Sequence, residues 1–403
     1  MEATWRWFGP DDPVTLRDAR QAGATGIVTA LHQYAPGVEW PVEAIRERQR
    51  QIEAAGLRWS VVESVNLSEA IKQRSGPWRE HIDAYIATLR NLASCGLRTV
   101  CYNAMPVLDW LRTDLDWTLP DGSITMRLDP IAMAAFDLFV LARPDAEADW
   151  TDGQQRAAHT LFRSMSPADL DRLQSIVLAG LPGSKGVYSL DFVRQSIAQY
   201  QIIGRDGLRA NLGEFLRAVA PAAQELGVRL SIHPDDPPRS LLGLPRIAST
   251  RDDLDFLLEQ SPEPANGITF CSGSLGVRSD NDLPAILQSV APRVWFVHLR
   301  ATHREPASYP VSPSSPDPAP ETFHEAPHLE GDVDIVELIR ILVREQRRRT
   351  ADGDPTPIPF RADHGLKILT DPQRPSVPGY PAVGRLKGLA ELRGILAAVQ
   401  RLT

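Results

Sequence analysis

The sequence predicts one α/β domain that folds as an eight-stranded (β/α)8 TIM barrel over residues 1–403. Short runs rich in β-branched and aromatic residues recur along the chain, and amphipathic helical segments separate them. Eight such runs alternate with helices, which is typical of a parallel barrel with its helices outside. A chain of 403 residues has the length of one barrel with insertions.

The predicted strands follow one another at intervals that leave room for a helix in most cases. An open doubly wound sheet is the alternative, but it needs a glycine-rich phosphate turn after its first strand. The first predicted strand here is followed by Pro-Asp-Asp-Pro, which favours the barrel. The predicted strands are residues 4–9, 25–31, 58–64, 98–105, 229–236, 267–274, 293–300 and 358–365.

The predicted helices carry recognisable start and stop signals. Gly56 and Gly96 each follow the last residue of an apolar periodicity, which is the usual position of a helix-ending glycine. Pro77 stands near the first turn of another helix, where proline is tolerated. The predicted helices between strands are residues 42–56, 77–96, 211–227, 251–260, 332–349 and 382–402.

Two segments are longer than ordinary barrel loops. Residues 106–206 separate the fourth and fifth strands and contain helical patterns at 130–144 and 166–183, so we expect a helical insertion over one face rather than a second core. Residues 301–331 include the stretch 305–320 with six prolines, which predicts a long, exposed and largely extended loop.

Composition and charge exclude several classes of protein. Hydrophobic residues make up 43% and charged residues 23%, as in ordinary globular enzymes. The net charge of −8 is unfavourable for a nucleic-acid or anionic-membrane partner. Three widely spaced cysteines imply no disulfide framework, and we find neither a signal peptide nor an apolar run of membrane-spanning length. We therefore expect a cytoplasmic enzyme that acts on a small molecule and assembles as a homo-oligomer.

Four consecutive strands each present a potential metal ligand where the strand ends, which is where barrel enzymes place their reacting groups. These residues are His233, Cys271, His298 and Asp363. Each has another interpretation: the cysteine as a small core residue, the histidines as structural groups, and the aspartate as a helix cap. Together they favour a mixed sulfur, nitrogen and oxygen site for Mn²⁺, Fe²⁺ or Zn²⁺.

Other side chains are candidates for binding the substrate. Arg300 follows His298 by two positions, so it emerges on the same strand face and could hold a carboxylate, although a surface ion pair is the alternative. Cys95 and Cys101 lack neighbouring ligands and are expected to be packing residues. Aromatic packing is the alternative for Trp7, and helix capping is the alternative for His324. The predicted substrate-binding residues are Trp7, His32, Glu63, Asn103, Arg300 and His324.

Several long motifs resemble those of bacterial mannonate dehydratases, the lyases of hexuronate catabolism. The resemblance runs from residue 4 to the C-terminus. Its clearest parts are HPDDPPR (233–239), CSGSLGVRSDNDL (271–283), FHEAPHLEGDVD (323–334), DHG (363–365) and PGYPAVGRLKGLAELRG (378–394). The chain departs from the family pattern at Ser68 and Leu366, where histidines are expected.

The resemblance implies a xylose-isomerase-like barrel that dehydrates D-mannonate to 2-dehydro-3-deoxy-D-gluconate with Mn²⁺ or Fe²⁺. It places the metal ligands at His233, Cys271, His298 and Asp363. It places the acid–base groups at His364 and Tyr380. A metal-dependent sugar isomerase or epimerase on the same barrel is one alternative, but such enzymes usually gather carboxylates around the metal. A catalytically inactive barrel that binds a sugar acid is the other alternative.

Overall fold

Eight parallel strands close into a barrel in the computed structural model, which describes residues 1–108, 110–179, 188–305 and 321–402. The order around the barrel is β1-β12-β9-β8-β7-β4-β3-β2, so the first and last strands pair and close it. This confirms the predicted (β/α)8 barrel. The barrel strands are β1 (Glu2–Arg6), β2 (Gly26–Thr29), β3 (Arg58–Glu63), β4 (Thr99–Tyr102), β7 (Arg229–Ile232), β8 (Asn266–Cys271), β9 (Val294–Leu299) and β12 (Pro359–Ala362).

The barrel strands are buried on both faces, which explains their nearly continuous apolar sequences. One face of each strand points into the barrel, where Val28, Val61, Cys101 and Phe296 form a small separate core. The other face packs against the surrounding helices in a much larger apolar cluster. Because alternate residues of a strand point to opposite faces, the inward positions of β3, β8, β9 and β12 can carry polar groups without disturbing the outer core.

Helices surround the barrel and follow most of its strands. Thr15 and Thr250 begin two of them with a capping box, in which the threonine and an aspartate three residues later exchange hydrogen bonds. Gly56 and Gly96 have φ of 72° and 82°, as expected for the glycines predicted to end α2 and α4. The outer helices are α1 (Leu16–Gln21), α2 (Val42–Ala54), α4 (Trp78–Ser94), α8 (Leu190–Glu225), α9 (Arg251–Glu259), α11 (Leu283–Val290), α12 (Ile335–Ala351) and α13 (Ala382–Leu402).

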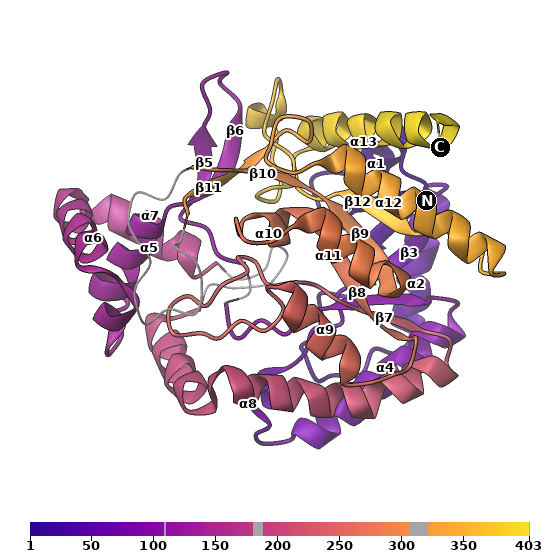
Figure 1. The fold of residues 1–403 in the computed structure, drawn as a ribbon, viewed down its shortest axis with the longest axis horizontal. Coiled ribbons are helices and arrows are strands. Elements are labelled where there is room, and N and C mark those ends of the chain that lie inside the picture. The colour runs from indigo at the N-terminus through magenta and orange to yellow at the C-terminus, as the bar shows by residue number, and fades with distance from the viewer. Residues whose placement is uncertain (109, 180–187, 306–320, 403) are drawn as a thin grey trace.

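Helix α8 is longer than the sequence indicated. The predicted helix at 211–227 is its second part, and Gly204, with φ 64° and ψ −177°, interrupts the helical backbone before it. Figure 1 shows α8 running along the lower edge of the molecule toward the inserted helices. A shorter helix, α10 (Ser272–Gly276), begins directly after β8, so Cys271 is both the end of a strand and the start of a helix.

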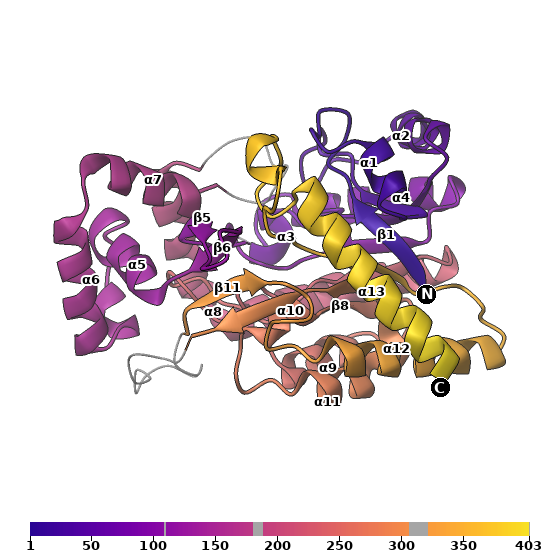
Figure 2. The same ribbon diagram turned by 90° about the horizontal axis from the view of Figure 1, so that it is seen from above.

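The insertion predicted at 106–206 contains helices, and Figures 1 and 2 both show three of them to one side of the barrel, away from the two chain ends. These helices are α5 (Pro130–Ala135), α6 (Asp152–Ser164) and α7 (Pro167–Val177). The same segment also contains two strands that the sequence did not indicate, β5 (Asp114–Thr118) and β6 (Ile124–Leu128). The sequence therefore predicted the helices of this insertion but not its strands.

The predicted loop at 301–331 also contributes strands, β10 (Ala301–Arg304) and β11 (Phe323–Ala326), whereas its residues 306–320 lie outside the described part of the chain. Together with β5 and β6 these strands form a four-stranded antiparallel sheet in the order β10-β11-β6-β5. Since β10 begins two residues after β9 ends, this sheet lies at the carboxyl ends of the barrel strands.

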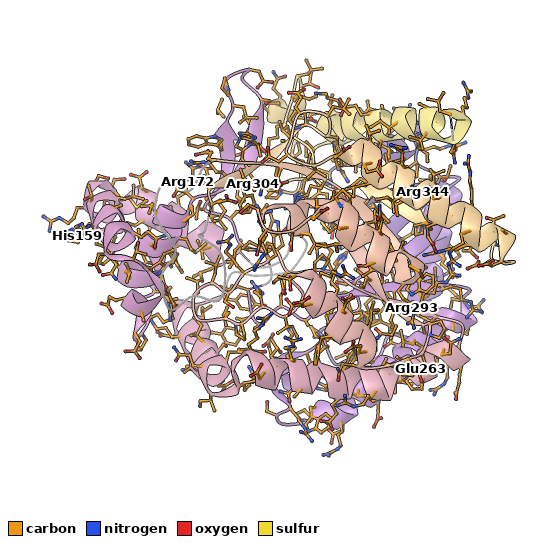
Figure 3. The ribbon with its side chains drawn as sticks, in the orientation of Figure 1. His159, Arg172, Glu263, Arg293, Arg304 and Arg344 are labelled. Carbon is orange, nitrogen blue, oxygen red and sulfur yellow. The ribbon has the colours of Figure 1, made fainter. Side chains whose placement is uncertain are left out.

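Charged side chains cover the outside of the molecule. Figure 3 shows His159 on α6, Arg172 on α7 and Arg344 on α12 directed outward, and all three are exposed. Within the described residues, no helix combines the length and the apolar character that crossing a membrane requires.

Phe215 joins helix α8 to the rest of the barrel, and its removal should destabilise the fold. The side chain is fully buried and its ring lies 5.1 Å from Tyr85 of α4 and 5.7 Å from Tyr102 of β4. We expect Phe215→Ala to lower the free energy of unfolding by about 3–5 kcal/mol, because it leaves a cavity. Chemical denaturation measures this, with Ile202→Ala, 87% exposed on the same helix, as the control that should change little. Equal losses in the two variants would contradict this packing role.

Candidate active site

Three predicted metal ligands converge at the carboxyl ends of β7, β8 and β9. His233 follows β7, Cys271 ends β8 and His298 lies in β9, and one ligand atom from each falls within 4.8 Å of the others. His233 Nε2 lies 3.1 Å from His298 Nδ1. Cys271 and His298 are direct register partners across neighbouring strands, so the barrel itself fixes their approach.

Asp363, the fourth predicted ligand, lies beside this group at the end of β12. Its Oδ2 is 3.8 Å from Cys271 Sγ and 3.9 Å from His298 Nδ1. Burial would raise the pKa of Asp363, but the charges of Arg361, His364, His298 and Arg300 outweigh it and hold that pKa well below its usual range. The carboxylate is therefore an anion facing two imidazoles and a thiol. This donor set suits a borderline divalent metal such as Mn²⁺, Fe²⁺ or Zn²⁺.

Glu63 orients one of these imidazoles. Its Oε1 lies 3.4 Å from His298 Nε2, which leaves Nδ1 of the same ring facing His233. A carboxylate behind a ligating histidine commonly fixes which ring nitrogen faces the metal. Burial would raise the pKa of Glu63, but Arg361, His298 and Arg6 lower it well below its ordinary value. The sequence placed Glu63 among substrate-binding residues; the structure also gives it this second contact.

The two predicted acid–base residues lie next to the ligand group. Tyr380 donates its hydroxyl hydrogen to Asp363 Oδ1 across 3.4 Å. The His364 and Tyr380 rings are 5.2 Å apart and nearly perpendicular, and His364 Nδ1 lies 3.0 Å from Glu325 Oε1. Burial and the neighbouring Asp363 both raise the pKa of Tyr380, so its phenol is protonated at neutral pH.

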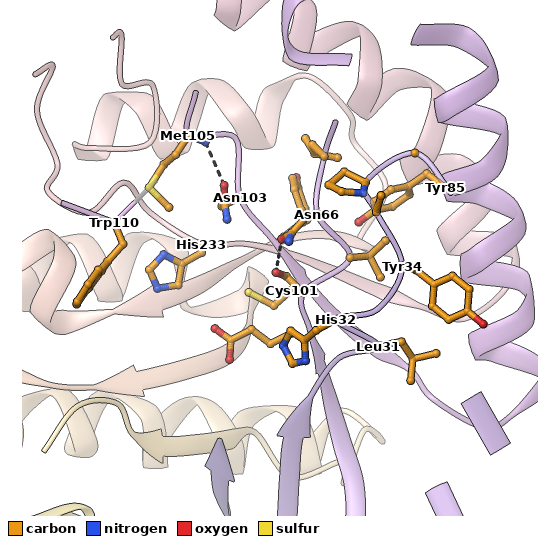
Figure 4. A pocket seen from close by; sticks show the side chains of 18 of the residues that line it. Leu31, His32, Tyr34, Asn66, Tyr85, Cys101, Asn103, Met105, Trp110 and His233 are labelled. Carbon is orange, nitrogen blue, oxygen red and sulfur yellow. Dashed lines mark hydrogen bonds between the residues drawn. The ribbon is translucent and has the colours of Figure 1, made fainter. Parts of the chain in front are cut away.

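A cavity of about 480 Å³ opens over this cluster. Figure 4 shows His32, Asn103, His233 and Trp110 around it, with Cys101 near its floor. His233, Asp363, His364 and Tyr380 line the cavity, whereas Cys271 and His298 are fully buried and contact those lining residues. Of the predicted substrate-binding residues, those that line it are His32, Glu63, Asn103 and Arg300.

Two predicted substrate-binding residues, Trp7 and His324, do not line the cavity. The ring of Trp7 packs under the Arg48 guanidinium at 5.2 Å, which fits the packing alternative. The ring of His324 lies 5.3 Å from His303 on the four-stranded sheet. Strand β1 ends at Arg6, before Trp7, so the alternation of side chains between the two faces of a strand does not determine where Trp7 points.

His32 is a neutral hydrogen-bonding group rather than a cation. Burial, followed by the positive charges of Arg6 and Arg48, lowers the pKa of His32 to about 3. Its Nε2 lies 3.3 Å from Arg6 Nη2, so this ring nitrogen accepts a hydrogen bond from the guanidinium. A neutral imidazole in the cavity wall can bind a hydroxyl group without adding charge to the site.

Sequence reasoning missed several buried charged residues around the cluster. Arg361, 2% exposed, pairs with both Glu63 and Asp363. It precedes Asp363 by two positions on β12, so strand alternation could have indicated a shared face. Arg300, a predicted substrate-binding residue, belongs to a ring of buried ion pairs with residues outside the predicted set. The ring pairs at 2.7–2.9 Å in the order Arg300–Asp236–Arg112–Glu325, and Arg300 Nε closes it on Glu325 Oε2 at 2.9 Å.

The residues that depart from the family pattern stand beside the cavity rather than in its wall. Ser68 caps α3 (Glu69–Gln73), and its hydroxyl lies 2.7 Å from Nδ1 of His81, which does line the cavity. Leu366 is buried. Cys101 packs inside the barrel as predicted and accepts a hydrogen bond from Thr269 at 3.3 Å, but it also reaches the cavity.

The buried acids predict a loss of stability in acid. Burial would raise the pKa of Glu325, but Arg300, His364 and Arg112 lower it to about 2. An unfolded chain binds a proton at this residue near pH 4.3, so its contribution to stability is complete above that pH and disappears as the pH falls toward 2. We expect the urea unfolding midpoint to fall between pH 4.5 and 2, and to fall less steeply in Glu325→Gln. Glu305→Gln, 40% exposed in a surface pair, should keep the parental slope; parallel curves for all three proteins would contradict the assignment.

Comparisons with known proteins agree with this geometry. The family model for D-mannonate dehydratase (UxuA) matches residues 1–403. The mannonate dehydratase of Chromohalobacter salexigens is 54% identical over 402 residues, covering 100% of both chains. That of Marinomonas sp. is 50% identical over 395 residues, covering 98% of each. The crystal structure of mannonate dehydratase from Streptococcus suis serotype 2 superimposes with a TM-score of 0.76 at 30% identity, covering 100% of this chain and 94% of that one.

Proposed function

The chain belongs to the D-mannonate dehydratase family and is a carbon–oxygen hydro-lyase of that family; we propose that a divalent ion and two proton-transfer residues carry its reaction. The reaction removes water from D-mannonate and yields 2-dehydro-3-deoxy-D-gluconate. One observation carries the proposal: the ligand atoms of His233, Cys271 and His298 converge beside the carboxylate of Asp363 under the cavity.

The metal would be held by His233, Cys271, His298 and Asp363. When bound, it would act as a Lewis acid that stabilises the negative charge developing on the substrate oxygens. Glu63 supports this set from behind, because it holds Nε2 of His298 and directs Nδ1 toward the other ligands. Mn²⁺ and Fe²⁺ are the two ions we propose.

Dehydration needs two proton transfers at neighbouring carbons. The C2–H bond breaks and its proton passes to a base, while the C3–O bond breaks and an acid donates a proton so that the oxygen leaves as water. His364 and Tyr380 are the groups we assign to these two steps, because both line the cavity next to Asp363. The resulting enol then takes a proton at C3 and becomes the 2-keto acid.

Positive and neutral donors in the cavity suit a sugar acid. Arg300 is 2% exposed, lines the cavity and retains a buried Nη2 without a partner in the described part of the chain, so it can donate to the substrate carboxylate. His32 and Asn103 present neutral polar groups from the opposite strands for the hydroxyls of the substrate.

Activity on D-mannonate tests the reaction directly. We expect protein loaded with Mn²⁺ to form a semicarbazide-reactive 2-keto acid with loss of one water, observed by mass spectrometry. An isomerase or epimerase would give a product of unchanged mass, and an inactive sugar-acid-binding barrel would give none; either result would overturn the assigned reaction. Chelation should abolish turnover, and Mn²⁺ or Fe²⁺ should restore it.

Cys271→Ser tests the ligand set independently of activity. A hydroxyl is a poorer donor than a thiolate for these metals, so Mn²⁺ affinity measured by calorimetry should fall about tenfold or more. Cys95→Ser, a half-buried residue at the end of α4, is the matched control and should bind Mn²⁺ as the parent does. Parental affinity in Cys271→Ser would show that this thiol only packs.

Substitution of the proton-transfer residues should lower turnover without removing the metal. We expect His364→Asn and Tyr380→Phe each to reduce kcat by about 10²-fold or more. Metal content by elemental analysis and the thermal unfolding midpoint should change little, because neither residue belongs to the ligand set. Near-parental turnover in Tyr380→Phe would remove the tyrosine from the chemistry.

A further inference from the structure

We propose that Glu325 is a positioning residue that holds the His364 imidazole in its reactive orientation, and that the four-stranded sheet serves to deliver it. The proposal rests on the function proposed above, in which His364 transfers a proton. Glu325 lies on β11, outside the barrel, yet its Oε1 is 3.0 Å from His364 Nδ1. Nothing in the sequence pattern of the barrel strands would place a carboxylate at this point.

His364 needs such support because its own backbone gives little. The residue follows Asp363 in a segment without regular structure, beyond the end of β12. Its ring meets Trp110 at 6.2 Å and Tyr380 at 5.2 Å, both nearly perpendicular, and neither contact distinguishes the two orientations related by a half-turn about the Cβ–Cγ bond. The 3.0 Å approach of Glu325 Oε1 to Nδ1 favours one of these orientations, since a ring carbon at that position could not pair with the carboxylate.

Glu325 is itself held from every side. Its backbone pairs with Thr302 of β10, and its carbonyl accepts a hydrogen bond from Thr125 Oγ1 of β6 at 3.0 Å. Its side chain is 2% exposed and is paired with Arg112 and with Arg300, each at 2.9 Å. Because these contacts fix the Glu325 carboxylate, it can set the orientation of the less restrained His364 imidazole.

The contact also determines which nitrogen faces the reaction. With Nδ1 3.0 Å from Glu325 Oε1, the other nitrogen of the ring, Nε2, lies 4.0 Å from Asp363 Oδ2, on the side of the ligand group. A ring turned the other way would place a carbon there. The two insertions that build the sheet thus contribute to catalysis by fixing one orientation of one side chain.

A double-mutant cycle tests this proposal on the full-length protein loaded with Mn²⁺. Four proteins are compared: the parent, Glu325→Gln, His364→Asn and the double variant. We expect Glu325→Gln to lower kcat about 10- to 100-fold with KM within threefold of the parent and metal content unchanged. In the His364→Asn background the same change should cost less than threefold, because there is no imidazole left to position.

Two further variants separate positioning from stability. Glu325→Asp keeps the charge that Arg112 and Arg300 need but withdraws the oxygen from His364, so it should fold and still lose kcat. Glu305→Gln breaks the pair with Arg127 on the same sheet, 3.0 Å long and partly exposed, and should leave kcat within twofold of the parent.

The possible outcomes separate this proposal from the proposed function. Equal losses from Glu325→Gln in both backgrounds, a parental kcat in Glu325→Asp, or a rise in KM alone would overturn the positioning role and leave His364 as a proton-transfer residue. Near-parental turnover in His364→Asn would overturn the role of His364 and this proposal with it. A loss of kcat confined to the background that contains His364 would support the proposal.

Discussion

The contact of Arg361 with two buried carboxylates is the interaction on which the site depends. Glu63 comes from the third strand and Asp363 from the end of the last, and both are anions with little access to water. Two such charges side by side would be strongly destabilising without a cation between them. Arg361 lies opposite Thr4 in the register of β12 and β1, so the strand pairing that closes the barrel also puts the cation in place. The site and the closed barrel therefore depend on the same strand pairing.

The convergence of the proposed ligand residues could be predicted from the sequence, because strands that follow one another along the chain become neighbours in a parallel barrel. His233, Cys271 and His298 end successive strands, and the strand periodicity alone puts those ends on one rim. The pairing of Arg361 with Glu63 could not be found in the same way, since the two residues are 298 positions apart and a cation inside a strand resembles a surface residue. The identity of an ion-pair partner depends on which strands meet, and only the closed barrel shows this.

The four-stranded sheet shows a different limit of sequence reasoning. Its strands are four or five residues long, β5 is largely exposed, and β6 pairs with β11 about two hundred positions later. Such segments have no apolar alternation long enough to indicate a strand, and their structure comes from a partner that is remote in the chain. Trp7 and His324 were predicted to face the substrate on local pattern, but the cavity wall is set by where β1 and β11 end and turn.

The two halves of the chain contribute different groups to the cavity. The residues proposed to hold the metal lie in or directly after β7, β8, β9 and β12, whereas Arg6, His32, Glu63 and Asn103 reach the cavity from β1 to β4 and the loops after them. Of these four first-half residues, Glu63 is the one whose side chain is paired with a proposed ligand, His298. For protein engineering this means that a library aimed at other sugar acids can be confined to the first 110 residues. Such a library leaves the four proposed metal ligands and the two proposed proton-transfer residues unchanged, because all six lie at residue 233 or later.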